Sequence, residues 1–194
     1  MDLYLIRHGK TKGNLEGRYV GRTDEGLQED FIFELKEKGM PAVDGIYVSP
    51  MKRCIETCEH IYPGRNYEIV PNLKEMDFGD FEYKSFEELN GNIIYQSWID
   101  SNGEMPFPNG ESMVIFQNRC KIAFEKAINK AMESGFKSVA FVVHGGTIMA
   151  ILDAYSNPHQ DYYHWQVKNG CGYQGRIEVI DERMVISTLH RLFD

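Results

Sequence analysis

Two histidines in this sequence each follow directly on an apolar run. Residues 3–9 read Leu-Tyr-Leu-Ile-Arg-His-Gly, and residues 140–146 read Ala-Phe-Val-Val-His-Gly-Gly. Runs of this kind are typical of buried strands, and open α/β sheets bind their ligands at the carboxyl ends of the strands. We therefore expect His8, its neighbour Arg7, and His144 to meet at one sheet edge. A cation beside two imidazoles predicts a site for an anion, and a phosphoryl group is the expected one.

The segment after His8 is rich in glycines and cations. A loop of this composition can bring backbone N–H groups and guanidinium groups close to phosphate oxygens. The alternative is a solvated loop with no ligand. Thr11 and Asn14 lie in this segment, and we expect Thr11 to contribute to substrate binding, whereas Arg18 and Arg22 fit either interpretation equally well.

A third cation, Arg53, lies in the sequence Ser-Pro-Met-Lys-Arg that begins at Ser49. This sequence predicts a strand end followed by a helix, whose free N–H groups form an anion site at the same sheet edge. A cation in the first turn of a helix is slightly unfavourable, so Arg53 needs a reason to be there. A bound phosphate would supply that reason.

Two carboxylates could handle the proton that phosphoryl transfer requires. Residues 73–82 interleave acidic and aromatic side chains, and desolvation by such neighbours can raise a carboxyl pKa. Glu75 or Asp77 could then hold a proton for a leaving group. From the pattern alone, a structural role for either carboxylate is an equally good interpretation.

Strand and helix patterns alternate along the chain. They predict strands at 2–7, 46–48, 68–70 and 138–143, helices at 31–38, 51–61, 112–134 and 147–155, and a hairpin of 175–181 with 184–190. Strands separated by helices predict a three-layer α/β/α sandwich with a mostly parallel sheet, to which the hairpin adds an antiparallel edge. We interpret residues 1–194 as one domain, with a lid-like insertion at about 75–111.

Composition narrows the classes of function. The net charge of −8 argues against nucleic-acid binding, and no apolar run approaches the ~18 residues of a membrane-spanning helix. Cys54 and Cys58 have helical spacing but no second ligand pair, so we interpret them as core thiols rather than metal ligands. We therefore expect a cytoplasmic protein that binds neither membranes nor nucleic acid. The oligomeric state is left open, and a homodimer is one candidate.

Five motifs in their order along the chain resemble the histidine phosphatase (phosphoglycerate mutase-like) superfamily. They are Leu-Ile-Arg-His-Gly, Ser-Pro-Met-Lys-Arg, Leu-Lys-Glu-Met-Asp-Phe-Gly-Asp-Phe-Glu, Asn-Gly-Glu-Ser and Val-Val-His-Gly-Gly. Within the superfamily, the chain length and the segments 75–82 and 163–172 look most like the α-ribazole phosphatases of cobalamin nucleotide-loop assembly.

The resemblance implies a phosphoglycerate mutase-like fold and a role for each motif residue. His8 would be the nucleophile that becomes phosphorylated, and Glu75 the proton donor. The residues that would bind the phosphoryl group are Arg7, Arg53 and His144, assisted by Asn14. We add Gly145, next to His144, to the residues expected to bind substrate.

The implied activity is the hydrolysis of a small phosphorylated metabolite, with α-ribazole phosphate as the first candidate. No metal ion and no other cofactor is expected. The alternatives are a phosphoglycerate mutase, a broad-specificity sugar or acid phosphatase, and a phosphate-binding regulatory module without catalysis.

The sequence departs from the family pattern in two places. Lys10 stands where the family usually has glutamate or glutamine, and residues 25–28, Glu-Gly-Leu-Gln, replace the usual Pro-Leu-Thr. Neither change removes a catalytic group. Both affect the rim at which substrate enters, and we expect Lys10 to be a solvated charge rather than a ligand.

Overall fold

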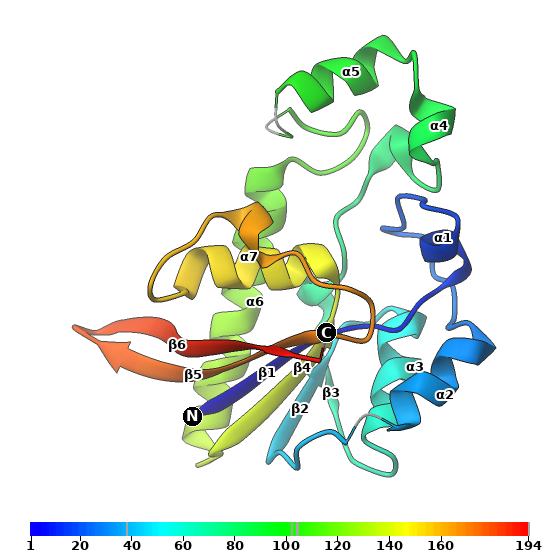
Figure 1. Ribbon diagram of the computed structural model, residues 1–194. Helices are drawn as coiled ribbons and strands as arrows, with labels where there is room; N and C mark the ends of the chain where they lie inside the picture. Colours follow the sequence, from blue (N-terminus) through cyan, green and yellow to red (C-terminus); the bar gives the residue numbers. More distant parts are fainter. Residues whose placement is uncertain (38, 102, 104, 194) are drawn as a thin grey trace.

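A computed structural model describes residues 1–37, 39–101, 103 and 105–193. The strands form a mixed sheet in the order β3-β2-β4-β1-β5-β6. Their bounds are β1 Asp2–Arg7, β2 Gly45–Val48, β3 Glu68–Ile69, β4 Ser138–Val143, β5 Gly172–Ile180 and β6 Arg183–Leu192. Figure 1 shows this sheet with helices packed around it.

The register of the central strands brings the two His-Gly sequences together. β1 and β4 are parallel neighbours, with Arg7 paired to Val143 at their carboxyl ends. β5 is antiparallel to β1, and β6 is antiparallel to β5. The predicted antiparallel edge is therefore confirmed. A further consequence is that β6 runs in the same direction as β1 and ends at the same sheet edge.

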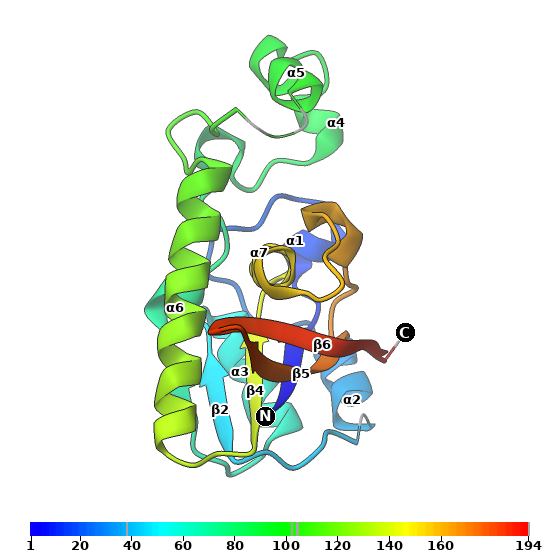
Figure 2. The same cartoon turned by 90° about the vertical axis from the view of Figure 1, so that its left-hand side faces the viewer.

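Helices cover both faces of the sheet, as the three-layer prediction requires (Figures 1 and 2). One face packs on α2, Glu29–Glu37, and α3, Lys52–Ile61. The other packs on α6, Met113–Glu133, and α7, Gly145–Tyr155.

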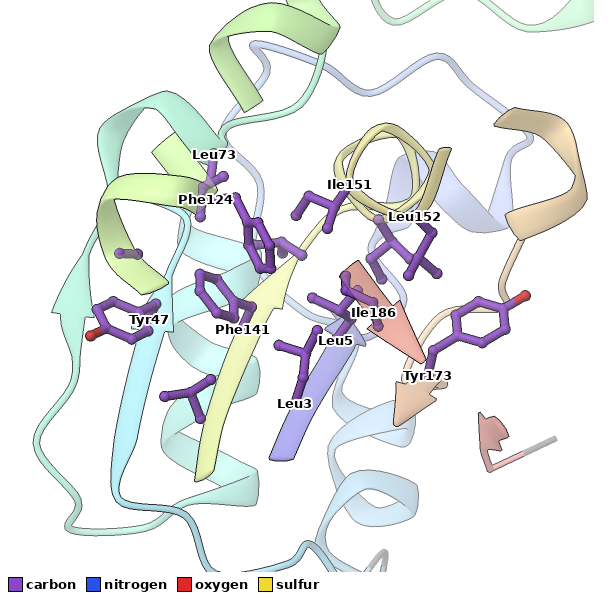
Figure 3. Packing of buried hydrophobic residues seen from close by; sticks show 14 of the residues in the cluster. Leu3, Leu5, Tyr47, Leu73, Phe124, Phe141, Ile151, Leu152, Tyr173 and Ile186 are labelled. Carbon is purple, nitrogen blue, oxygen red and sulfur yellow. The ribbon is translucent and has the colours of Figure 1, made fainter. Parts of the chain in front are cut away.

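Alternation along the strands explains this division. Leu3, Leu5 and Phe141 face α6 and α7, whereas Ile6 and Val142 face α2 and α3. Figure 3 shows Phe141 of β4 against Phe124 of α6, with ring centroids 5.1 Å apart. The core therefore fixes the two strands that carry the histidines.

The remaining elements are short and lie mostly in loops. They are α1 Lys12–Leu15, the 3-10 turns η1 Pro71–Leu73, η2 Gly79–Phe81 and η3 Tyr162–Trp165, and the insertion helices α4 Phe86–Leu89 and α5 Ile93–Asp100. Figure 1 shows α4 and α5 apart from the sheet, beyond the edge where β1 and β4 end. Phe81, Tyr95 and Phe107 of the insertion share a third buried cluster with Phe116 of α6 and Ala150 of α7.

The two thiols on α3 are buried and unpaired, as predicted for core cysteines. Over the described part of the chain, none of the helices combines the length and the apolar character needed to cross a bilayer.

Candidate active site

The ends of β1 and β4 place His8 and His144 in contact. The backbone N–H of His8 donates to the carbonyl oxygen of Val143 at 2.9 Å, which continues the strand pairing by one residue. The two imidazole ring centroids are 5.2 Å apart and the ring planes are inclined by 65°. Both rings therefore belong to one site, at the sheet edge where the motifs placed them.

His8 is held as a neutral ring with a defined tautomer. Its Nδ1 lies 2.7 Å from the carbonyl oxygen of Gly9, and because a carbonyl can only accept, Nδ1 must carry the proton. Burial, followed by the positive charges of Arg53 and Arg7, holds the pKa of His8 well below its usual value of 6.5. Nε2 is consequently left with a lone pair, which is the atom that a nucleophilic histidine needs.

Gly9 is required for space rather than for an unusual backbone angle. A Cβ at this position would lie 2.8 Å from Cδ1 of Phe31 and 3.0 Å from side chains of Leu27 and Leu35. The backbone N–H of Gly9 also donates to Thr57 Oγ1 at 2.9 Å. The turn after β1 is thus packed closely against α2 and α3.

His144 is fully buried, and both of its ring nitrogens have protein partners. Arg53 Nε donates to its Nδ1 at 3.3 Å, and Ser49 Oγ lies 2.7 Å from its Nε2. Since arginine can only donate, Nδ1 accepts and Nε2–H donates to the serine. Burial, followed by the charges of Arg53, His8 and Arg7, holds the pKa of His144 well below its usual value. From the sequence, Ser49 stands out only as the first residue of the Ser-Pro-Met-Lys-Arg motif.

Arg53 is fully buried and uses most of its donors on the protein itself. Nη1 donates to Thr23 O at 2.9 Å, and Nη2 donates to Gly21 O at 2.9 Å and Val20 O at 3.3 Å. With Nε on His144, one of its five N–H groups is left for a ligand. In this structure Arg53 therefore orients His144 and holds the loop 20–23.

The same loop is held from its other side by the insertion. Glu82 Oε1 accepts hydrogen bonds from the backbone N–H groups of Gly21, at 3.0 Å, and Thr23, at 2.8 Å. The loop thus connects the guanidinium of Arg53 to the insertion.

Arg7 lines the cavity and has one buried donor without a partner among the described residues. Its Nη1 donates to Val167 O at 2.7 Å, whereas Nε is buried without a hydrogen-bond partner among the described residues. A Cβ added at Gly145 would lie 3.4 Å from Arg7 Cζ, so this glycine sits directly against the guanidinium. A buried N–H group without a partner is costly.

Of the two candidate carboxylates, Glu75 is the one that lines the cavity. Its Oε2 accepts from the backbone N–H of Gly146 at 3.1 Å, at the start of α7. Asp77 lies elsewhere, where its Oδ1 accepts from Gly79 N at 2.9 Å and from Arg22 Nη1 at 3.2 Å. The geometry therefore separates two residues that the sequence pattern left equivalent.

Thr11 and Asn14 are not among the residues that line the cavity. Thr11 is the buried N-cap of α1, and its hydroxyl accepts from Asn14 N at 3.3 Å. Asn14 Oδ1 accepts a hydrogen bond from Asn169 Nδ2 at 3.0 Å. The Nδ2 group of Asn169 also donates to His8 O at 3.2 Å. Asn169 therefore connects α1 to the backbone of the candidate nucleophile, a role that its residue type alone does not predict.

A cavity of about 970 Å³ borders this site, with Arg7, Glu75, Gly145 and Gly146 in its lining. The buried rings of His8 and His144 lie beneath that lining and are not part of it. Its lining includes the aromatic residues Tyr19, Phe31, Phe78, Trp98, Phe107, Tyr162 and Tyr163. It also includes four cations, Arg7, Lys10, Lys168 and Arg191, and two carboxylates, Glu34 and Glu75. Among the residues that the structure describes, no three His, Cys, Asp or Glu side chains are grouped so that they could hold a metal ion.

Comparison with known proteins agrees with this geometry. Residues 3–190 match the family described as the histidine phosphatase superfamily, branch 1. An adenosylcobalamin/alpha-ribazole phosphatase of Salmonella typhimurium is 29% identical over 183 residues, which cover 88% of each chain.

Two solved structures share the fold along nearly their whole length. The alpha-ribazole phosphatase of Shigella flexneri superimposes with a TM-score of 0.79 at 23% identity and covers 97% of this chain and 96% of its own. A phosphoglycerate mutase of Thermus thermophilus superimposes with a TM-score of 0.73 at 26% identity. The match covers 100% of this chain and 99% of the mutase chain. The predicted phosphoglycerate mutase-like fold is confirmed. The chain therefore belongs to the histidine phosphatase superfamily, branch 1, as a phosphoric monoester hydrolase.

Proposed function

We propose that the chain is a metal-independent phosphomonoesterase that works through a phosphohistidine on His8. The observation that carries this proposal is the bond from His8 Nδ1 to Gly9 O, because it leaves the lone pair on Nε2. The guanidinium of Arg7, in the lining of the cavity, offers donors for the phosphoryl oxygens. Such preorganised donors stabilise the charge of the transition state in a site that is poor in water.

In the first half-reaction, the Nε2 lone pair of His8 forms a bond to phosphorus while the bond from phosphorus to the ester oxygen breaks. The departing oxygen takes a proton from the carboxyl group of Glu75, which acts as general acid. Nδ1–H continues to donate to Gly9 O and supports the positive charge that the phosphorylated ring acquires.

In the second half-reaction, a water molecule attacks the phosphorus of the phosphohistidine. The Glu75 carboxylate takes its proton, and the electron pair of the breaking N–P bond returns to Nε2. Inorganic phosphate leaves, and both residues regain their starting protonation states.

The first substrate to test is α-ribazole phosphate. A relative named for this activity aligns along 88% of the chain, and the aromatic wall of the cavity suits an aromatic base. Phosphoglycerate mutase activity is the second candidate function, because a solved structure of that name shares the fold at 26% identity.

A hydrolysis screen would test the proposal. We would measure kcat/KM for α-ribazole phosphate, phosphoglycerates, sugar phosphates and p-nitrophenyl phosphate, together with mutase activity on phosphoglycerate. We expect release of inorganic phosphate without added metal, and faster hydrolysis than mutase turnover. Isomerisation of phosphoglycerate at a rate above that of all hydrolysis would favour the mutase instead.

A further inference from the structure

The Asn-Gly-Glu-Ser motif is one of the five family motifs, but the proposed chemistry gives it no role. Its residues lie against the segment that follows the proposed general acid. Asn109 Nδ2 donates to both carboxylate oxygens of Asp80, at 3.0 and 3.2 Å. A Cβ added at Gly110 would lie 2.5 Å from Asp77 O, so the two stretches of backbone are in close contact. The position of the motif therefore points to a role in holding that segment.

Glu111, the acid of this motif, binds the backbone of Asp77 on both sides. Glu111 N donates to Asp77 O at 2.9 Å, and Asp77 N donates to Glu111 Oε2 at 3.0 Å. The Glu111 carboxylate also accepts from Nε and Nη2 of Arg119, each at 2.7 Å. The side chains of Arg119 and Glu111 are only 14% and 17% exposed, so solvent screens this bidentate pair little. Such pairs fix geometry as well as charge.

Arg119 uses its remaining donors on the backbone beside and at the proposed acid. Nη1 donates to Asn72 O at 2.9 Å and to Lys74 O at 2.7 Å, and Nη2 donates to Glu75 O at 2.9 Å. Together with the two bonds to Glu111, these contacts occupy all five N–H groups of the guanidinium. Arg119 thus has no donor left for a ligand, and it is not among the residues that line the cavity.

The segment that carries Glu75 depends on such contacts, because residues 74–78 lie between η1 and η2 and belong to no helix or strand. The Glu75 side chain is held on the cavity side, where Oε2 accepts from Gly146 N at 3.1 Å. A Cβ at Gly146 would lie 2.4 Å from Glu75 Oε1, so the carboxylate lies directly against the start of α7. Arg119 holds the backbone of the same residue from the opposite side chain of contacts, on α6.

Arg119 is itself placed by a long helix. It lies in the second turn of α6, and its Cζ is 4.8 Å from the ring centroid of the buried Phe116. α6 runs from the insertion along the sheet (Figure 2), where Phe124 and Ile128 enter the main core. Groups on a packed helix hold a position more precisely than groups on a loop. The helix can therefore fix the loop that carries Glu75.

We propose that Arg119 and Glu111 are positioning residues for the general acid. The guanidinium fixes the backbone of residues 72–77, and the Glu75 carboxylate thereby stays at the start of α7. This inference rests on the proposed function, because it assumes that Glu75 protonates the leaving group. A lysine at position 119 would keep the charge but not the planar fork that reaches four groups at once.

A comparison of leaving groups tests this role. The alkyl ester is whichever of α-ribazole phosphate, O-phosphoserine and glucose 6-phosphate the wild type hydrolyses fastest, and the aryl ester is p-nitrophenyl phosphate. Arg119→Gln should lower kcat by about tenfold or more on the alkyl ester, because a displaced acid is poorly placed to protonate the departing oxygen. It should lower kcat by about threefold at most on the aryl ester, whose phenolate leaves without a proton. Partial unfolding would lower both by the same factor and leave the ratio of the two losses unchanged.

Two further single variants complete the test on the side of Arg119. Glu111→Gln removes the charge that holds the guanidinium and should change the ratio in the same direction. Arg119→Lys should also do so by a smaller factor, and it replaces Arg119→Gln if that protein does not fold.

Arg18→Gln is the matched control. Arg18 Nη1 also joins a carboxylate and a carbonyl, Glu88 Oε2 at 2.7 Å and Tyr83 O at 2.6 Å. These partners lie in the insertion and not in the segment that carries Glu75, and Arg18 is not in the cavity lining. The ratio of the two losses should stay at one in this variant.

A double variant shows whether Arg119 acts through Glu75. In the Glu75→Gln background, adding Arg119→Gln should cause no further change in the ratio, because no acid remains to be displaced. Additive changes in the ratio would mean that the two residues act independently, and would overturn the proposal.

The amide signal of Gly146 reports the position of Glu75 without turnover. Because Gly146 N donates to Glu75 Oε2, Glu75→Ala gives the reference signal for the lost bond. In nitrogen–proton correlation spectra, Arg119→Gln should move the Gly146 signal towards that reference, and Arg18→Gln should leave it at the wild-type position. A signal at the wild-type position in both Arg119 variants would overturn the positioning role.

The two readouts separate failure of this inference from failure of the proposed function. If Glu75→Gln lowers kcat equally on both esters, Glu75 is not the general acid, and the Gly146 signal alone decides whether Arg119 positions it. If Glu75→Gln depends on the leaving group but both Arg119 variants lower kcat equally on the two esters, the positioning role is rejected and the mechanism stands.

Discussion

Ser49 Oγ lies 2.7 Å from Nε2 of His144 and accepts the proton of that ring nitrogen. Ser49→Ala would leave this buried N–H group with only the weaker acceptor Cys54 Sγ, 3.5 Å away, and a buried donor left wholly unsatisfied costs about 1–3 kcal/mol. We expect the free energy of unfolding, measured with urea, to fall by up to that amount. We also expect kcat/KM to fall, because the ring loses its oxygen acceptor at Nε2.

The control for this substitution is Ser49→Thr, which keeps the hydroxyl group. It should retain more activity and stability than Ser49→Ala. Equal losses in the two variants would show that the size of the side chain matters at this position and that the hydrogen bond does not.

His8→Ala should abolish turnover while leaving the fold intact, because it removes the only lone pair that the proposed attack uses. In the wild-type protein, rapid quenching during turnover should trap acid-labile phosphate, and peptide mapping should place it on His8. Phosphate found on a serine, or full activity in His8→Ala, would refute the phosphohistidine mechanism.

Glu75→Gln should lower kcat by roughly 10²-fold or more for esters of alkyl alcohols, the usual scale for acid–base catalysis. The loss should shrink for p-nitrophenyl phosphate, whose phenolate leaves without a proton. Asp77→Asn is the control, because Asp77 lies outside the cavity and binds Arg22. An equal loss on both kinds of ester in Glu75→Gln would assign Glu75 to binding rather than to proton transfer.

The buried histidines predict how stability depends on pH. In the folded protein the pKa values of His8 and His144 lie well below 6.5, so in the window between those values and 6.5 the unfolded chain binds more protons. Stability is therefore full above pH 6.5 and falls as the pH drops below it. Each histidine contributes up to about 1.4 kcal/mol per pH unit.

Urea unfolding between pH 7.5 and 5.5 measures this slope, above the range in which ordinary carboxylates titrate. His8→Gln should reduce this slope by the contribution of one histidine. A slope that is the same in both proteins would mean that His8 is protonated as readily in the folded state as in the unfolded chain. For the same reason, if protonation of His8 causes kcat/KM to fall at acid pH, the midpoint of that fall should lie below pH 6.5.

Catalysis should not require a divalent metal, because the proposed steps use only His8, Glu75 and the cations of the site. We expect the same kcat/KM with and without excess chelator. Loss of activity on chelation, followed by recovery on adding Mg²⁺ or Zn²⁺, would contradict the mechanism.

Hydrophobic periodicity was sufficient to predict the elements that form the core. The helix predicted at 112–134 and the strand predicted at 138–143 agree closely with α6 and β4, because their apolar residues recur with the period of each element. α4 and α5 were not predicted as helices. They are short, and their buried residues Leu89 and Tyr95 belong to a cluster that contains no residue of the sheet.

The site was predictable where chemistry depends on side-chain type, and less so where it depends on the backbone. His8 and His144 follow strand-like runs, so their meeting could be inferred. The bonds from Arg53 to the carbonyl groups of residues 20–23 could not, since every residue has a carbonyl group. Asn169 escaped notice for a similar reason, because it acts on the backbone of His8.

The attachment of the loop 20–23 to both Arg53 and Glu82 has a consequence for engineering. The outer helices α4 and α5 begin after Glu82, so a graft that replaces residues 86–100 with the corresponding segment of a relative keeps both attachments. Such chimaeras would change Trp98 in the cavity wall and retain the phosphoryl-transfer residues. The fold thereby offers a way to vary substrate choice by exchanging one segment, without redesigning the catalytic centre.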